Sequence, residues 1–351
     1  MMSSNTTITI VGDDFHINGT PTFCGRTFRN HRIEGLLPNA RMIQGVFDDL
    51  NPETRSRWDF PDGSWDAEHN TDAFIAAMPT WRAHGLIAFT LGLQGGSPEG
   101  YSRHQPWHNS AFASDGGQRP DYFARVARIL DTADKLGMVV ILSLFYFGQN
   151  QRLRDASAIR KAICETVDWL CERKDGHVII EIANETDHRD YIHECFRPDR
   201  VHQLIKLVQE HSAGRVANAQ GHLYAGVSFC GGVIPGEEVV AASDLILLHG
   251  NGVEEPRGIR EMVRTVRAMA AYRGQPIVFN EDDHFAFGEA ENNFMAATAA
   301  HASWGYFDYR MKGETDFHQG YQSMPCDWGI TSARKSAFFE LLREMTGSPG
   351  C

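Results

Sequence analysis

The stretch that decides the fold is VIIEIANE, residues 178–185. Its apolar, mostly β-branched part is typical of a strand buried on both faces of a parallel sheet. Glu181, inside this run, is expected to pair with a basic residue in the interior. The strand pattern ends abruptly at Asn184 and Glu185, an amide next to a carboxylic acid. Catalytic groups of α/β barrels lie at the carboxyl ends of the strands, so this ending predicts a functional site.

A second stretch, PIVFNE at residues 276–281, repeats this pattern. An apolar strand again delivers a glutamate, Glu281, at its carboxyl end. Carboxyl ends of the strands in a closed parallel barrel meet at one rim, so Glu185 and Glu281 are expected to lie near each other. Paired carboxyl groups are suited to acid–base and nucleophilic catalysis.

Strand and helix patterns alternate along most of the chain. Strands are expected at residues 22–27, 86–93, 138–147, 178–185, 215–220, 245–249, 276–281 and 305–309, and helices at 71–81, 121–136, 156–173, 199–212, 237–242, 257–272, 289–303 and 332–345. Eight strands, each followed by a helix, predict an α/β fold of the closed (β/α)₈ TIM barrel type. No G-x-G-x-x-G follows the first strand, which argues against a dinucleotide-binding sheet.

The length of 351 residues suits one such barrel, which takes about 250 residues and more with insertions. We therefore expect a single catalytic domain over residues 1–351. It begins with a short β-hairpin at residues 1–20. The polar segment from the first strand to residue 70, which contains Arg41, and the segment 94–120 are expected to be long βα loops. Loops of this length are usually functional.

Composition excludes several classes of protein. Hydrophobic residues make up 42% and charged residues 22%, as in ordinary globular proteins. Asp and Glu exceed Lys and Arg by 45 − 33 = 12, and this acidic balance argues against binding to nucleic acid or anionic membranes. No apolar stretch approaches the roughly 20 residues of a spanning helix.

The N-terminus and the cysteines bear on the cellular compartment. Residues 1–7 are polar and show no signal peptide, so a cytoplasmic protein is expected unless a signal peptide was removed. The seven cysteines form no C-x-x-C pair and are consistent with a reducing compartment. The oligomeric state is not predicted by the sequence.

Four features resemble the retaining glycoside hydrolases of clan A, and within it the cellulase-like glycoside hydrolase family 5. They are the Asn184–Glu185 pair after the fourth strand, Glu281 at the end of the seventh, His249 at the end of the sixth, and the opening at residues 17–26. The resemblance implies a carbohydrate substrate, an oligosaccharide or glycoside cleaved by double displacement. It implies no metal ion and no organic cofactor. Such enzymes need two carboxyl groups about 5 Å apart.

The resemblance also implies a role for each matching residue. Glu185 corresponds to the acid/base and Glu281 to the nucleophile, while Asn184 corresponds to the amide that bonds the sugar 2-hydroxyl. His249 corresponds to the histidine that lines the subsite of the cleaved sugar. Arg26, after the first expected strand, is a candidate to hold the nucleophile ionised by charge pairing.

The sequence departs from the family pattern at the last strands. Tyr309 stands where the family usually has a tryptophan platform, and tyrosine can also stack on a sugar. Asn251 and Gly252 replace an aromatic residue that often follows the strand-six histidine. Asp282 and Asp283 directly follow Glu281 and would raise its pKa if they faced it.

Trp65 and Trp107 lie in the long loops, where they are candidates for sugar platforms or for anchors that hold the loops in place. Both interpretations stay open at this stage.

Two other functions compete with a glycosidase. A metal-dependent TIM-barrel hydrolase would use converging histidines and carboxylates, and His104, His108 and residues 282–284 supply such groups. Pro106 argues against a helical pair of histidine ligands. A non-catalytic carbohydrate-binding barrel would keep the aromatic residues but would not need both Glu185 and Glu281.

Overall fold

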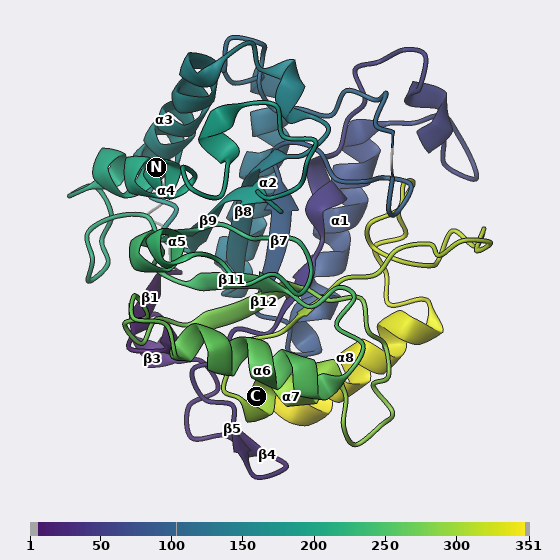
Figure 1. Cartoon of the computed structure of the whole chain (residues 1–351). Coiled ribbons are helices and arrows are strands. Elements are labelled where there is room, and N and C mark those ends of the chain that lie inside the picture. The colour runs from purple at the N-terminus through teal and green to yellow at the C-terminus, as the bar shows by residue number, and fades with distance from the viewer. Residues whose placement is uncertain (1–5, 103, 348–351) are drawn as a thin grey trace.

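The chain folds as a (β/α)₈ barrel, described for residues 6–102 and 104–347 in a computed structural model (Figure 1). The barrel strands are β6 (Asn39–Arg41), β7 (Ala88–Gly92), β8 (Val139–Tyr146), β9 (Val178–Asn184), β10 (Ala225–Gly226), β11 (Ile246–His249), β12 (Ile277–Glu281) and β13 (Gly305–Tyr306). The helices are α1 (Ala67–Ala83), α2 (Pro120–Leu136), α3 (Ala156–Arg173), α4 (His202–Ser212), α5 (Glu237–Ala242), α6 (Pro256–Arg267), α7 (Asn293–Ala299) and α8 (Ala333–Thr346). The prediction of this fold class is confirmed.

The strands pair in parallel around the barrel. Six of them form one sheet in the order β10-β9-β8-β7-β6-β13, and β11 pairs with β12. Two parallel bridges, Val278 with Ser303 and Asp282 with Tyr306, join β12 to the β13 segment. The amide of Asp244, just before β11, donates to the carbonyl of Ala225 at 3.0 Å. These bonds close the barrel, so all strand ends meet at a common rim.

Apolar burial explains why the longest strands were readable in the sequence. Every residue of β7, β8 and β9 is buried, as expected for strands covered on the outside by helices and packed on the inside. The helices α1 to α4 surround one side of the sheet, and α6 to α8 surround the other (Figure 1). Asp66, Asp155 and Ser332 cap the N-termini of α1, α3 and α8 through side-chain oxygens.

A hairpin of β1 (Ile8–Val11) and β2 (Asp14–Ile17), extended by β3 (Thr20–Pro21), covers the amino ends of the barrel strands. Phe15 of this hairpin is fully buried in an apolar cluster with Val139, Ile179 and Val278, residues near the starts of β8, β9 and β12. Burying one such side chain stabilises the fold by roughly 1.5–3 kcal/mol. The predicted hairpin is confirmed for residues 8–17, while residues 1–5 lie outside the described residues.

Two predicted strands were wrong. Residues 22–27 do not form the first barrel strand: they run through turns, with positive φ at Phe23 and Gly25, into a hairpin of β4 (Thr27–Phe28) and β5 (His31–Arg32). The fifth strand is β10 and not residues 215–220, which form a loop. The true strands β6 and β10 have three and two residues. Such short strands leave no periodic pattern to detect.

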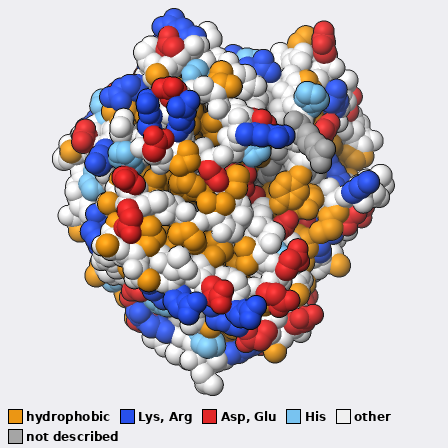
Figure 2. Space-filling model, in the orientation of Figure 1, with side chains coloured by type: hydrophobic (Ala, Val, Ile, Leu, Met, Phe, Trp, Pro, Cys, Tyr) orange, Lys and Arg blue, Asp and Glu red, His pale blue; other side chains and the backbone are white. Residues whose placement is uncertain are grey.

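Long loops leave the carboxyl ends of β6 and β7, as predicted, and a third long loop follows β13. The first contains the 3₁₀ helices η1 (Ile43–Val46) and η2 (Arg55–Trp58); shorter 3₁₀ helices, η3 (Asn150–Arg152) and η4 (Glu194–Phe196), follow β8 and β9. On the face shown in Figure 2, charged side chains of both signs lie around the edge and hydrophobic ones gather in the centre. No helix in the described part of the chain is long and apolar enough to cross a membrane.

Candidate active site

The barrel brings Glu185 and Glu281 to the same rim. Glu281 is the last residue of β12, and Glu185 directly follows β9. The Glu185 backbone has a φ of +49°, a conformation that residues other than glycine rarely adopt, and its amide donates to Ser228 Oγ at 3.1 Å. Such strained residues cluster at functional sites. The side chains of Glu185 and Glu281 are 13% and 7% exposed, so both are largely shielded from bulk water.

His249, the last residue of β11, lies between the two carboxyl groups. Its Nδ1 is 3.1 Å from Glu185 Oε1 and 3.8 Å from Glu281 Oε2. One carboxyl oxygen of each glutamate and one histidine nitrogen all lie within 4.8 Å of one another. The histidine side chain is fully buried, and its Nε2 has no hydrogen-bond partner among the described residues.

Arg41, at the end of β6, contacts three polar side chains in this part of the barrel. Its Nε lies 2.5 Å from Glu281 Oε2, its Nη1 lies 3.4 Å from Glu181 Oε2, and its Nη2 donates to Asn184 Oδ1. The guanidinium is 1% exposed. The expectation that Glu181 pairs with a basic residue inside the barrel is confirmed. Because a buried charge is tolerated only when it is paired, Arg41 makes the burial of these carboxylates possible.

A second set of contacts holds the other oxygen of Glu281. Asn251 Nδ2 donates to Glu281 Oε1 at 2.8 Å and to the Tyr101 hydroxyl at 2.6 Å. The Tyr101 hydroxyl in turn donates to Asp283 Oδ2 at 2.9 Å. Asn251 stands at the position where the family that the sequence resembles often has an aromatic residue, and here its side-chain amide contacts Glu281. Tyr101, from the loop after β7, orients that amide.

The pKa values of these groups reflect burial and charge together. Burial raises the pKa of Glu281 above its ordinary value, while His249 and Arg41 act in the opposite direction. Burial lowers the pKa of His249, but the charges of Glu281 and Glu185 outweigh it, and the net shift is upward. For Glu181, burial acts to raise the pKa, but Arg41, His249 and the hydroxyl groups of Ser143 and Ser228 together outweigh it, and the net shift is downward. Glu181 is thus the carboxyl group that stays ionised with Arg41.

Two more predicted residues lie beside this cluster. Asn184 is 1% exposed, and its Oδ1 is held by Arg41. The Tyr309 ring lies at 4.9 Å from the Tyr101 ring, centroid to centroid, and stacks on Phe307 at 5.5 Å. Asn184 is therefore fixed beside the two glutamates through Arg41, and Tyr309 presents a partly exposed ring.

Arg26 does not lie at this rim, so the predicted pairing with Glu281 is wrong. It lines a cavity with Ile87 and Gly137, residues just before β7 and β8, and its guanidinium packs against Gly347 after α8. This is the amino end of the barrel strands. The prediction failed because residues 22–27 were taken as the first strand; the arginine that ends the true first strand is Arg41.

Trp65 and Trp107 are loop anchors, and the prediction that they bind substrate is wrong. Trp107 is fully buried and packs edge-on against Trp58 at 5.6 Å; Trp65 is 5% exposed and lies between Phe47 and Phe60. Neither ring has an exposed face for a sugar. Their burial holds the long loops after β6 and β7 in place.

Three residues beside the two glutamates were not predicted from the sequence: Arg41, Tyr101 and Tyr146. Tyr146 ends β8, and its hydroxyl lies 3.0 Å from Ser97 Oγ. Burial, followed by the charges of Glu281 and Glu185, raises its pKa. The position of Tyr146 at a strand end was a usable signal, because β8 was correctly predicted. Tyr101 lies in a loop whose course no local pattern gives.

Two groups of side chains near the rim could hold a metal ion. One is Glu185, His249 and Glu281; the other is Asp282, Asp283 and His284. In the second group Asp282 is already engaged, because Oδ2 accepts from Trp304 Nε1 at 2.8 Å and Oδ1 lies 2.5 Å from His284 Nδ1. Asp282 thus anchors the loop after β12, and its carboxyl group does not face Glu281.

Solved structures share this fold along nearly the whole chain. A glycoside hydrolase family 5 mannosidase from Rhizomucor miehei is 12% identical with a TM-score of 0.56, covering 98% of this chain and 98% of that chain. An endo-1,4-beta-mannanase from the same organism is 9% identical with a TM-score of 0.56, covering 97% and 98%. A family 5 lichenase from Caldicellulosiruptor sp. F32 is 14% identical with a TM-score of 0.51, covering 89% and 93%.

The sequence itself matches no protein-family model and no curated protein. At these low identities the structural likeness establishes the fold: this chain has the (β/α)₈ barrel of the glycoside hydrolase family 5 enzymes.

Proposed function

We propose that this protein is a retaining glycoside hydrolase in which Glu185 is the acid/base and Glu281 the nucleophile. The observation that carries the proposal is the approach of their carboxyl oxygens to within 4.8 Å at one rim of the barrel. Retaining glycosidases have carboxyl groups about 5–5.5 Å apart, and inverting ones about 6.5–9.5 Å apart. The short separation leaves no room for a water molecule between sugar and base, as inversion requires.

The contacts of the two glutamates suit different roles. Both oxygens of Glu281 accept hydrogen bonds or an ion pair, from Asn251 and from Arg41, and these donors favour the ionised form that attacks the anomeric carbon. Glu185 faces His249 and protonates the leaving oxygen. Once the leaving group has departed, the Glu185 carboxylate takes a proton from water, which hydrolyses the glycosyl ester on Glu281.

Asn184 is suited to hold the sugar next to the nucleophile. Arg41 fixes the side-chain oxygen of Asn184, and its Nδ2 has no hydrogen-bond partner among the described residues. This amide can donate to a sugar hydroxyl, an interaction that strengthens as charge develops in the transition state. Tyr309 adds a partly exposed ring for stacking.

The substrate of a glycoside hydrolase is a carbohydrate. The solved structures with the same fold guide the choice of the first substrates to test. Their names give mannosidase, mannanase and lichenase. A panel of aryl β-mannosides and β-glucosides, with α-anomers as controls, therefore tests the activity. Proton NMR of the reaction should show a first-formed sugar with the same anomeric configuration as the substrate; the opposite configuration would exclude the double-displacement mechanism.

A metal-dependent hydrolase is the second candidate, because Glu185, His249 and Glu281 could supply three ligand atoms. The position of Arg41 argues against it. Its Nε lies 2.5 Å from Glu281 Oε2, so a cation bound there would face a buried positive charge. A non-catalytic sugar-binding barrel is distinguished by the same panel, since it would bind glycosides without turnover.

A further inference from the structure

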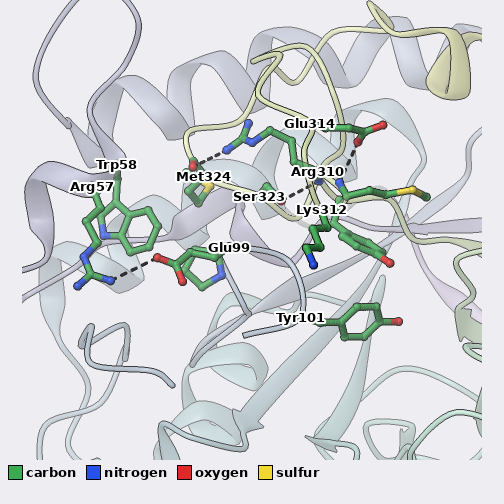
Figure 3. A pocket seen from close by; sticks show the side chains of 12 residues that line it. Arg57, Trp58, Glu99, Tyr101, Arg310, Lys312, Glu314, Ser323 and Met324 are labelled. Carbon is green, nitrogen blue, oxygen red and sulfur yellow. Dashed lines mark hydrogen bonds and ion pairs between the residues drawn. The ribbon is translucent and has the colours of Figure 1, made fainter. Parts of the chain in front are cut away.

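A cavity of about 520 Å³ lies beside the candidate active site, between the loops that follow β6, β7 and β13. Its lining includes Tyr101 of the β7 loop, Tyr309, and charged residues of the β13 loop (Figure 3). Tyr101 connects it to the catalytic centre, because its hydroxyl accepts from Asn251, which also bonds Glu281. A sugar in this cavity would thus lie next to the glutamates.

Both carboxylates of the lining, Glu99 and Glu314, are paired with an arginine, and the partner of Glu314 lies outside the lining. Arg57 Nη1 lies 3.3 Å from Glu99 Oε1, the pair drawn at the left of Figure 3. Glu314 accepts from the guanidinium of Arg334 at 2.6 and 2.9 Å. These residues contribute little net charge to the cavity.

Two other cations are not compensated in this way. Arg310 Nη1 and Nη2 donate to the backbone carbonyls of Pro325 and Met324, at 2.9 and 2.5 Å, so the guanidinium contacts carbonyl oxygens in place of a carboxylate. Lys312 has no ion pair or hydrogen bond within the described residues, and its side chain extends into the same cavity as that of Tyr101 (Figure 3). Burial lowers the pKa of Arg310, as expected for a cation held without a close counterion.

In the lining, three cations (Arg57, Arg310 and Lys312) stand against two carboxylates (Glu99 and Glu314), and a further carboxylate, Asp283, is bonded to the Tyr101 hydroxyl. The chain as a whole has a net charge of −12. An acidic protein repels anions at long range, so an anionic group would be bound only where the local charge is reversed. The rings of Tyr101 and Tyr309 in the same lining add a surface on which the apolar face of a sugar can stack. The residue Tyr101 is 56% exposed, and Tyr309 is partly buried.

We propose that this cavity is a subsite for an acidic sugar, in which Lys312 and Arg310 pair with the anionic group while Tyr101 and Tyr309 pack against the ring. This subsite proposal rests on the proposed glycosidase function, because the acidic sugar is part of the glycoside that Glu185 and Glu281 cleave. The anionic group is a carboxylate, as in a uronic acid, or a phosphate ester; both present oxygen atoms to an ammonium or guanidinium group.

Ligand-observed NMR titrations on the full-length wild-type protein test the subsite without turnover. D-glucuronate, D-glucose 6-phosphate and D-glucose are compared, since these monosaccharides contain no glycosidic bond to cleave. At least one of the two anionic sugars should bind about tenfold more tightly than glucose, and added salt should weaken that binding. The anion that binds more tightly identifies the source of the charge. Equal binding of all three sugars would overturn the proposal.

Two charge-reversal variants distinguish binding in the cavity from a general effect of the surface charge. Lys312→Glu should weaken binding of the preferred anion by about tenfold and leave glucose binding unchanged. Lys206→Glu is the matched control, because Lys206 is an exposed residue of α4 outside this cavity. Equal loss in both variants would overturn the proposal, and thermal unfolding of both confirms that they are folded.

The binding and activity measurements distinguish failure of the subsite proposal from failure of the glycosidase proposal. If the protein binds acidic sugars through Lys312 but hydrolyses no glycoside, the subsite stands and the glycosidase proposal fails. If it hydrolyses neutral glycosides and Lys312→Glu changes neither affinity nor the preference between acidic and neutral glycosides, the glycosidase proposal stands and the subsite fails.

Discussion

Arg41 and Glu281 form a buried ion pair, with Nε at 2.5 Å from Oε2, that joins the first strand of the barrel to the seventh. The same guanidinium contacts Glu181 and Asn184. One residue therefore balances the charge of the interior and fixes two groups of the proposed active site.

Arg41→Met should reduce both stability and activity, because Glu181 and Glu281 would be left buried without their cation. We expect a loss of about 3–5 kcal/mol in the free energy of unfolding, measured by urea denaturation, and a fall in kcat of about 10²-fold or more. Arg26→Met at the opposite end of the barrel is the control and should leave kcat unchanged. A substantial loss of kcat in the control alone would show that the assignment of the two arginines is reversed.

The acid side of the pH profile should report on Glu281. Burial raises its pKa above the ordinary value of 4.5, so kcat/KM should increase with pH as the carboxyl group ionises, with the midpoint above 4.5. Asn251 opposes this shift by donating to the ionised form. Asn251→Ala should therefore move the acid limb to higher pH and lower kcat by about 10²-fold. An unchanged acid limb would show that Asn251 does not support the nucleophile.

The two classes of aromatic residue at the rim should respond differently to truncation. Trp107→Ala removes a fully buried ring and should cost about 3–5 kcal/mol of stability in urea denaturation. Tyr309→Ala removes a partly exposed ring and should raise KM roughly three- to tenfold with little loss of stability. If Tyr309→Ala left KM unchanged for every substrate cleaved, stacking on this ring would be excluded.

Chelation distinguishes the two hydrolase mechanisms. Because Arg41 and Asn251 already occupy both oxygens of Glu281, glycoside hydrolysis should be unaffected by dialysis against EDTA. The measurement is the initial rate before and after dialysis. Loss of the rate, with recovery on addition of Zn²⁺, would favour the metal-dependent mechanism.

The parts of the fold that were predictable are those with long buried strands. β8 and β9 have eight and seven residues, all buried, and their apolar runs are visible in the sequence. Because β9 and β12 were placed correctly, the positions of Glu185, Asn184 and Glu281 at strand ends of one rim could be predicted from the sequence. β6 and β10 have three and two residues, too few for a pattern, and the error at β6 replaced Arg41 by Arg26.

Contacts between loops could not be predicted in the same way. Tyr101 reaches Asn251 from a different βα unit, and this contact depends on how the loop after β7 folds over the rim. The interpretation of Trp65 and Trp107 depended on burial, which is a property of the packed loops and not of their local sequence. Aromatic residues in long loops were therefore ambiguous until the structure placed them.

The most direct test of the proposed mechanism is the trapping of the covalent intermediate. The protein is incubated with an activated 2-deoxy-2-fluoro glycoside of whichever sugar the substrate panel identifies, since the fluorine slows hydrolysis of the glycosyl ester. Mass spectrometry should show the addition of one glycosyl group, and peptide mapping should place it on Glu281. A label on Glu185 or on another residue, or no label together with a product of inverted configuration, would contradict the mechanism.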